Sequence, residues 1–305
     1  MSQVPVRVLQ RPPGGTHRGR FAPSPTGRLH FGSLVAALGS WLRARSQGGA
    51  WIVRMEDVDT TRVVPGAAED ILETLAAFGL ESDAPVLVQS ERSVRYAGAL
   101  EQLRKRDLAY PCHCSRGDLA AFGGVHPSRC VVSGAADGRP PAWRLRVGAS
   151  VVDFEDGVCG AQSQELARSV GDFVLRRSDG CYSYQLAVVV DDADQGVTEI
   201  VRGADLLDST PRQIHLQRTL GLPTPAYLHL PLVLDSSGRK LSKHDLARPV
   251  DRADPLPALR AALAFLGQHA TRESTVGEFL RVAANRFDPA RIPCERKTHV
   301  ALRKD

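Results

Sequence analysis

The chain has none of the features that would place it in a membrane or in an oxidising compartment. No run approaches the roughly eighteen uninterrupted apolar residues of a membrane-spanning helix. Its first residues include Pro12, Pro13, Gly14 and Gly15 and no apolar signal-peptide region. Six cysteines in 305 residues are too few for a disulfide scaffold. We therefore expect a cytoplasmic protein without membrane contact, with residues 1–17 as a flexible extension.

The composition is that of a globular protein with a mild excess of positive charge. Hydrophobic residues make up 43% of the chain and charged residues 24%, which is enough for one large domain and a smaller one. The formal net charge of +5 comes from 39 basic and 34 acidic residues. This balance favours an anionic partner such as a nucleic acid, but a basic surface without a partner remains open.

Residues 20–33 form the most distinctive stretch and read RFAPSPTGRLHFGS. We expect a strand up to Phe21, a tight turn through the prolines and glycines, and a helix from about Ser33. Backbone N–H groups and His30 would then point into one cleft, as in a loop that handles phosphate. The stretch matches neither the P-loop nor the Gly-x-Gly-x-x-Gly fingerprint, so taken alone it also fits an ordinary connection.

Strand and helix patterns alternate on both sides of a central break. Apolar spacing predicts a helix over 34–45, a strand over 51–55, a helix from 65 to 79, a short strand at 86–88 and a helix around 96–103. After the break it predicts a buried strand over 184–192, a helix over 209–220 and a strand over 227–234. This order predicts a doubly wound parallel sheet that is split in sequence. Asp191 and Asp192 would end a strand and point to opposite faces, so no shared metal is expected.

Residues 110–171 break the alternation, and they contain three cysteines and a histidine that could bind a metal ion. Cys112, Cys114 and Cys130, with His126 as the fourth ligand, offer three thiolates and one imidazole for tetrahedral zinc. Four protein ligands leave no open position, so one structural zinc ion is predicted; reduced cysteines without metal are the alternative. The remaining cysteines are expected to be isolated: Cys159, Cys181 and Cys294.

Residues 240–243 form a basic turn beyond the last predicted strand. The ammonium groups of Lys240 and Lys243 and the hydroxyl of Ser242 suit the triphosphate of ATP while charge builds on departing pyrophosphate. Taken alone, such a turn is also an ordinary surface loop.

Together, the loop at His30 and the turn at residues 240–243 resemble the two signatures of class I aminoacyl-tRNA synthetases. Three stretches resemble the glutamyl branch of that class: RFAPSPTG at 20–27, MEDVDT at 55–60 and GVTEIVRG at 196–203. The likeness covers about residues 18–250.

Two positions depart from the pattern of this class. Ser33 stands where the first signature usually has its second histidine, which glutamyl-type members tolerate. His244 stands where the second signature usually closes with serine, which leaves the role of position 244 open.

The resemblance implies a class I synthetase Rossmann-type fold that binds L-glutamate and ATP. Arg20 and Arg202 would hold the side-chain carboxylate with their planar donor forks, and Glu56 would face the ammonium. The implied glutamate site comprises Arg20, Phe21, Ala22, Pro23, Ser24, Glu56, Tyr184 and Arg202. Without the resemblance, Arg202 and Glu56 would also fit structural ion pairs, and Tyr184 would fit a core position.

The resemblance also implies an ATP site and two catalytic residues. The implied ATP site comprises His30, Gly32, Lys240, Ser242 and Lys243. His30, Lys243 and Mg²⁺ brought by ATP would stabilise the leaving pyrophosphate.

The length of the chain favours one branch of the family. Only 61 residues follow His244, too few for the large helical anticodon-binding region of full glutamyl-tRNA synthetases. The chain is therefore similar to the truncated glutamyl-queuosine members, which implies transfer of glutamate to the queuosine base in the anticodon loop of tRNA(Asp). Two alternatives remain: a minimal glutamyl-tRNA synthetase charging a tRNA 3′ end, and a catalytically dead zinc-containing tRNA-binding protein.

The expected fold class is α/β, a doubly wound parallel sheet split by a zinc-containing insertion, with a short, mainly helical C-terminal region. We expect a monomer. The expected divisions are the flexible extension at 1–17, the first half of the catalytic domain at 18–109, the insertion at 110–171, the second half at 172–225, and the lysine loop with a helical region at 226–305 that holds no anticodon-binding domain.

Overall fold

The computed structural model of the protein describes residues 17–132, 138–234, 249–294 and 297–299, the last of these by their backbone alone. The whole of the predicted lysine turn, with Lys240, Ser242 and Lys243, lies outside the described residues, and so does His244. None of the helices within the described ranges is long and apolar enough to cross a membrane.

The first third of the chain alternates strands and helices as the apolar spacing predicts. The elements are β1 (Arg18–Phe21), α1 (Phe31–Ser46), β2 (Ala50–Met55), α2 (Ala67–Ala77), β3 (Leu87–Val88) and α3 (Ser93–Lys105). Strand β2 pairs with β1 on one side and with β3 on the other, and both pairings are parallel. The ring of His30 caps α1, because its Nδ1 accepts a hydrogen bond from the backbone N–H of Ser33 at 3.3 Å.

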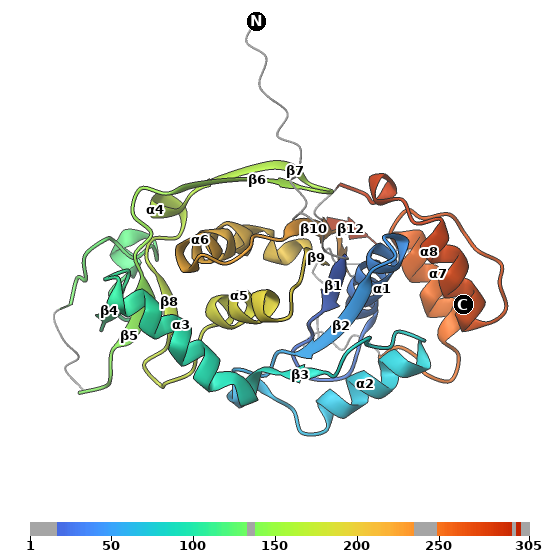
Figure 1. Ribbon diagram of the computed structural model, residues 1–305, viewed down its shortest axis with the longest axis horizontal. Coiled ribbons are helices and arrows are strands. Elements are labelled where there is room, and N and C mark those ends of the chain that lie inside the picture. Colours follow the sequence, from blue (N-terminus) through green and yellow to red (C-terminus); the bar gives the residue numbers. More distant parts are fainter. Residues whose placement is uncertain (1–16, 133–137, 235–248, 295–296, 300–305) are drawn as a thin grey trace, which may run out of the picture.

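The middle of the chain forms a separate antiparallel sheet and a long hairpin. Its elements are β4 (Ala109–Cys112), β5 (Ala142–Leu145), β6 (Val151–Asp156), β7 (Gly160–Glu165), α4 (Leu166–Ser169), β8 (Phe173–Arg176) and α5 (Tyr184–Asp194). Strand β5 lies between β4 and β8. The β6–β7 hairpin runs along one edge of the molecule from this sheet towards the central strands (Figure 1).

The last third returns to the parallel sheet and then becomes helical. Its elements are β9 (Glu199–Gly203), α6 (Thr210–Leu220), β10 (Ala226–Leu230), β11 (Leu232–Leu234), α7 (Pro255–Phe265), α8 (Val276–Asn285) and β12 (Lys297–His299). Strands β9 and β10 are parallel, and the tip of β6 joins β10 through the pair Asp156 and Tyr227. Helices α7 and α8 pack against α1 at one end of the molecule (Figure 1).

The two halves of the parallel sheet meet between β1 and β9. The backbone N–H of Thr198 donates to the carbonyl oxygen of Arg18 at 2.9 Å, which brings β9 beside β1. The strand order is then β3, β2, β1, β9, β10, in which the direction of winding reverses between β1 and β9, as in doubly wound folds. The predicted split parallel sheet is therefore confirmed, and its carboxyl edge at this reversal is the expected place for a ligand.

One predicted element is wrong. Residues 184–192, interpreted as a buried strand, form most of helix α5, which begins at the cap residue Ser183. All of Leu186 to Asp192 is buried, so nearly every side of the helix is covered and its sequence has no one-sided apolar spacing that would distinguish it from a strand. Asp191 and Asp192 therefore lie on a helix, and each is buried with cationic or polar partners.

Candidate functional site

The loop after β1 lies against the segment after β2. The backbone N–H of Glu56 donates to the carbonyl oxygen of Pro23 at 2.9 Å, and that of Val64 donates to Pro25 at 2.9 Å. Gly27 adopts a positive φ of 142°, a conformation that residues with a side chain rarely reach. The proline-rich stretch thus makes a fixed turn at the carboxyl end of β1, as predicted.

His30 lies where this loop enters α1. Besides capping the helix, its Nε2 lies 3.2 Å from the hydroxyl of Ser33, so the residue that departs from the family pattern contacts His30 directly. The backbone of His30 also pairs with Pro249, and the N–H of Val250 donates to the carbonyl oxygen of Leu29 at 3.1 Å. The chain that leaves residues 235–248 therefore passes beside His30.

Four buried charged side chains join β1, β2 and α5. Arg54 pairs with Asp192 at 2.8 Å and with Glu56 at 3.2 Å, and Arg20 pairs with Asp192 at 3.3 Å. Arg20 donates through Nε alone; within the described part of the chain its two Nη groups have no hydrogen-bond partner. Because the side chains of these four residues are at most 7% exposed, they hold one another in place.

Burial affects the two carboxylates of this group differently. Burial raises the pKa of Glu56 above its ordinary value, and the nearby Arg54 and Arg20 oppose this only in part. Burial also disfavours ionised Asp192, but Arg54 and Arg20 outweigh it and hold the pKa of Asp192 below its ordinary value. Asp192 is thus the permanent anion, whereas the charge of Glu56 would be stabilised further by a cationic ligand group.

Arg202 on β9 approaches the same region from the other half of the sheet. Its Nε donates to Nε2 of His229 at 3.1 Å and its Nη2 to the hydroxyl of Thr210 at 2.8 Å. Its Nη1 donates to the hydroxyl of Tyr184 at 3.4 Å, which leaves the second N–H of Nη1 without a partner among the described residues. Burial raises the pKa of Tyr184, so its hydroxyl remains protonated.

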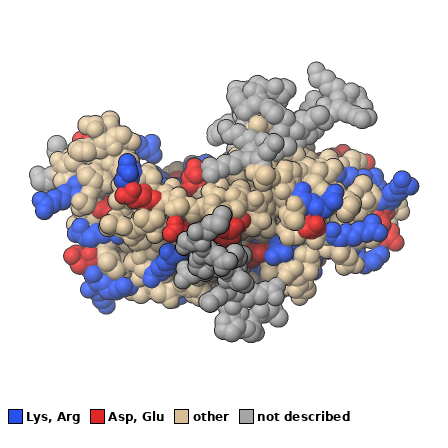
Figure 2. Space-filling model, turned by 90° about the horizontal axis from the view of Figure 1, so that it is seen from above, with Lys and Arg blue, Asp and Glu red and all other residues tan. Residues whose placement is uncertain are grey.

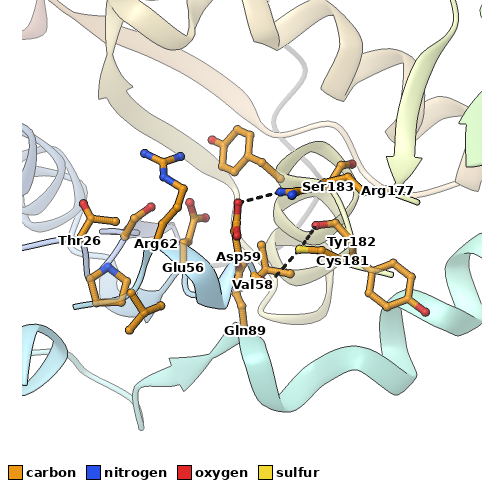
Figure 3. Close-up of a pocket in the computed structure, with 14 residues that line it drawn as sticks. Thr26, Glu56, Val58, Asp59, Arg62, Gln89, Arg177, Cys181, Tyr182 and Ser183 are labelled. Atoms are coloured by element: carbon orange, nitrogen blue, oxygen red, sulfur yellow. Dashed lines mark hydrogen bonds and ion pairs between the residues drawn. The ribbon is translucent and has the colours of Figure 1, made fainter. Parts of the chain in front are cut away.

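A cavity of about 280 Å³ opens beside these groups. Figure 3 shows Glu56, Asp59 and Arg62 on one side of the cavity and Tyr182 and Ser183 on the other. Ser24, Glu56 and Tyr184 of the predicted glutamate site line it, whereas the other predicted residues do not. Arg20 and Arg202 lie behind the lining, in contact with Asp192 and Tyr184 respectively.

Several residues of this region were missed by the sequence interpretation. The outer wall of the cavity includes Asp59 and Arg177, which pair at 2.9 Å across it (Figure 3). Arg54 and His229 support the predicted site from behind. Each lies within an otherwise apolar strand, and a charged or polar residue in such a strand signals a buried partner.

A second cluster lies in the insertion, at the far side of the molecule. The ligand atoms of Cys112, Cys114, His126 and Cys130 all lie within 4.8 Å of one another, as the spacing predicts. Three thiols and one imidazole at this separation are the donor set of a tetrahedral metal site, so the cluster can hold a metal ion. None of the six cysteines forms a disulfide, and the other three lie apart from the cluster, as expected.

Neighbouring side chains orient the histidine of this cluster. The hydroxyl of Tyr110 lies 3.2 Å from Nδ1 of His126 and donates to Asp172 at 2.7 Å, while Nε2 of His126 faces Cys112 at 3.2 Å. The imidazole therefore turns Nε2 towards the thiols, which is the orientation a metal ligand needs.

The thiols of the cluster differ in acidity. Burial disfavours ionised Cys114, but hydrogen bonds from the backbone of Val131 and Val132 outweigh it and lower the pKa of Cys114. Burial and the neighbouring Cys112 raise the pKa of Cys130 to about 12. A cation would be needed for all three thiols to ionise together, and the donor set therefore fits a bound metal ion.

Known proteins resemble the chain over nearly its whole length. The family described as "tRNA synthetases class I (E and Q), catalytic domain" matches residues 17–122 and 126–275. "Glutamyl-Q tRNA(Asp) synthetase" of Xanthomonas campestris pv. campestris is 55% identical over 293 residues, which cover 95% of this chain and 97% of that protein. A protein of the same name from Burkholderia cenocepacia is 55% identical over 293 residues, which cover 90% and 98% respectively.

Solved structures agree with these sequence matches. A glutamate tRNA ligase from Elizabethkingia meningosepticum, in complex with its amino acid, superposes with a TM-score of 0.77 at 28% identity. The superposition covers 93% of this chain and 67% of that one, and it confirms the predicted fold class. The chain therefore belongs to the class I glutamyl- and glutaminyl-tRNA synthetase family and, within it, to the glutamyl-Q tRNA(Asp) synthetases.

Proposed function

We propose that the protein activates L-glutamate with ATP and transfers the glutamyl group to queuosine in the anticodon loop of tRNA(Asp). The observation that carries this proposal is the convergence of Arg20, Glu56, Tyr184 and Arg202 beside one cavity. Such a site suits a molecule with a carboxylate at one end and an ammonium nearby. The names of the relatives, matched over 97% and 98% of their lengths, supply the acceptor.

The glutamate side chain is proposed to bind between the two arginines. The Nη groups of Arg20 and one N–H of Arg202 lack partners within the described part of the chain, so they are available to a carboxylate. Glu56 would receive the ammonium, which would stabilise its charge in this buried position. Phe21 at the end of β1, and Ala22, Pro23 and Ser24 in the loop that follows, are proposed to complete the site.

Activation then requires positioning rather than a covalent enzyme intermediate. The α-carboxylate of glutamate attacks the α-phosphorus of ATP, a carboxylate O–P bond forms, and the bond to the leaving pyrophosphate breaks. We propose that His30 and Gly32 at the start of α1, with Lys240, Ser242 and Lys243, hold the triphosphate, and that Mg²⁺ enters with ATP. His30 and Lys243 would stabilise the charge that develops on pyrophosphate.

The metal of the insertion is proposed to be one structural zinc ion held by Cys112, Cys114, His126 and Cys130. A closed set of three thiolates and one imidazole stabilises the fold around it and offers no position for a substrate. The insertion at residues 110–171 is proposed to separate the two halves of the catalytic domain, residues 18–109 and 172–225.

The acceptor is an RNA, and the surface carries scattered basic side chains that suit its phosphates. Figure 2 shows Lys and Arg side chains towards both ends of the visible face, interspersed with acidic ones. These charges would position the tRNA rather than read its sequence. An enzyme with this acceptor would meet it in the cytoplasm, acting there as a monomer.

Two measurements test the proposal. Glutamate-dependent ATP–pyrophosphate exchange without tRNA is expected, and its absence at high enzyme concentration would contradict activation. Labelled glutamate is then expected to transfer to tRNA(Asp) that carries queuosine and not to the same tRNA without it. Transfer should survive removal of the 3′ adenosine.

One alternative is favoured by a specific observation. The solved structures that superpose on the chain include glutamate tRNA ligases, which suggests a minimal glutamyl-tRNA synthetase. Transfer that depends on the 3′ adenosine and ignores queuosine would establish that alternative. A catalytically dead tRNA-binding protein would show neither exchange nor transfer.

A further inference from the structure

The two arginines of the proposed glutamate site are held in different ways. Arg20 pairs directly with the carboxylate of Asp192. Arg202 has no carboxylate within ion-pair distance among the described residues; a histidine, a threonine, a tyrosine and one backbone carbonyl receive its N–H groups. Its positive charge is therefore oriented by neutral groups and remains available to a ligand.

The tautomer of His229 follows from its hydrogen-bond partners, which are Arg202, Asp156 and the hydroxyl of Thr210, 3.2 Å from Nε2. Its Nε2 lies 3.1 Å from the Nε of Arg202, and because a guanidinium can only donate, Nε2 must accept. Its Nδ1 lies 2.6 Å from Oδ2 of Asp156, so Nδ1 carries the proton and donates it. Burial and the adjacent Arg202 lower the pKa of His229, although Asp156 opposes this, which agrees with a neutral ring.

Asp156 is itself fixed by the backbone. Its Oδ1 accepts hydrogen bonds from the N–H groups of Val158 at 3.0 Å, Cys159 at 2.8 Å and His229 at 3.2 Å. The side chains of Asp156 and His229 are both completely buried. Asp156 ends β6, so the hairpin of the insertion reaches the central sheet and contributes this carboxylate (Figure 1).

From this geometry we propose that Asp156 and His229 are positioning residues for Arg202, and through it for the side-chain carboxylate of glutamate. The proposal rests on the proposed function. A carboxylate in direct contact with Arg202 would orient its guanidinium but also neutralise its charge. The neutral imidazole of His229 orients the guanidinium instead, and it separates the guanidinium from the carboxylate of Asp156. The hairpin of the insertion thereby takes part in amino-acid recognition.

The variant Asp156→Asn tests this arrangement with little change of shape. Three backbone N–H groups hold the position of Oδ1, so the new amide must keep its oxygen there and turn its NH₂ towards His229. Nδ1 of His229 must then accept, and its proton moves to Nε2, which can donate to the hydroxyl of Thr210 but can no longer accept from the Nε of Arg202. We expect the KM for glutamate to rise about tenfold or more, while kcat changes less than about threefold.

Two substitutions of His229 separate the two hydrogen bonds. His229→Gln places an amide oxygen near the position of Nε2 and can still accept from Arg202, whereas His229→Asn reaches only Asp156. The proposal predicts that His229→Gln retains a lower KM for glutamate than His229→Asn. Equal KM values for the two variants would overturn it, because a role confined to packing does not distinguish these bonds.

The matched control is Glu199→Gln, the same change from carboxylate to amide on β9. Glu199 is buried but pairs with Arg43 and His17, and it lies three residues before Arg202 on a pleated strand, so it faces the other side. Its variant should lose stability and keep the wild-type KM for glutamate. Unfolding temperatures of all four variants show that each is folded at the assay temperature.

Wild-type exchange is measured first, so the two proposals fail differently. Wild-type activity with an unchanged KM in Asp156→Asn overturns the positioning role alone, whereas an inactive wild type overturns the proposed function. The ¹⁵N shifts of His229 test the arrangement in either case. A neutral ring protonated at Nδ1 in the wild type and at Nε2 in Asp156→Asn supports it; the same tautomer in both proteins overturns it.

Discussion

The proposed glutamate pocket and the Cys/His cluster both gather polar side chains into the interior, but they balance charge by different means. In the pocket, Arg20 and Arg54 share the carboxylate of Asp192, so the protein itself supplies both signs. In the cluster, the ligand atoms of three thiols and an imidazole lie within 4.8 Å of one another, and all of them can bind a cation. The pocket is therefore preorganised by folding alone, whereas the thiols of the cluster would need a bound ion to ionise together.

The largest expected effect is the loss of metal from the cluster. Cys130→Ser removes one of four ligands, and because structural zinc contributes about 10–16 kcal/mol of apparent binding free energy, the insertion should lose both metal and stability. The zinc content measured by elemental analysis is expected to fall from about one ion per chain to near none, and proteases should cut the insertion faster. Cys294→Ser, which changes an exposed cysteine outside the cluster, should keep its zinc. Unchanged zinc in Cys130→Ser would refute the ligand assignment.

The converse change should affect the pocket and spare the cluster. Lys243→Ala is expected to lower the rate of glutamate activation by about 10²–10³-fold, because one cation that stabilises the departing pyrophosphate is lost. Pyrophosphate exchange measures the rate, and elemental analysis should find the zinc content of the wild type. Lys105→Ala, the same change at the exposed end of α3, is the control and should leave the rate unchanged. Loss of zinc in Lys243→Ala would mean that the two sites are not independent.

The contrast also explains which parts of the site the sequence could predict. The Cys/His cluster follows from local spacing and donor chemistry, and the structure brings its four predicted members together. The pocket was predicted only through family motifs. Its supporting groups lie far apart in the chain, since Arg20 and Asp192 are separated by 172 positions, and nothing local pairs them.

The fold divides in the same way. Strands β1 and β2 and helix α1 were predicted because turns, caps and one-sided apolar spacing mark their ends. Helix α5 was mistaken for a strand because the packing of both halves of the sheet domain buries it on nearly all sides. That error also misplaced Asp192, and with it the ion pairs that hold Arg20.

A smaller effect should appear in the pH dependence of stability. Burial disfavours ionised Glu199, but His17 and Arg43 outweigh it and lower the pKa of Glu199 from 4.5 to about 2. A group with a lowered folded pKa stabilises the protein above its unfolded pKa and loses this contribution as the pH falls through the folded value. The free energy of unfolding of the wild type should therefore exceed that of Glu199→Gln by at most about 3 kcal/mol at neutral pH.

This difference should shrink as the pH falls from 4.5 towards 2, because protonated glutamate and glutamine are both neutral. Urea unfolding of both proteins at several pH values measures it. A difference that stays constant over this range would show that the ion pairs of Glu199 do not stabilise the sheet. Preorganisation of the pocket by buried ion pairs would then depend on the pairs of Asp192 with Arg20 and Arg54.

The smallest expected effect concerns the helix that carries the pocket. The hydroxyl of Ser183 accepts a hydrogen bond from the N–H of Leu186 at 3.4 Å and caps α5 just before Tyr184. Ser183→Ala should lower the free energy of unfolding by about 1 kcal/mol. Without its cap the first turn of α5 should fray, and because Tyr184 is the first residue of that turn, the KM for glutamate should rise slightly. Ser183→Thr keeps a capping hydroxyl, so thermal unfolding should show a smaller loss. If threonine destabilises the helix as much as alanine does, the cap is not what fixes Tyr184, and the pocket owes its order to the buried ion pairs of Asp192.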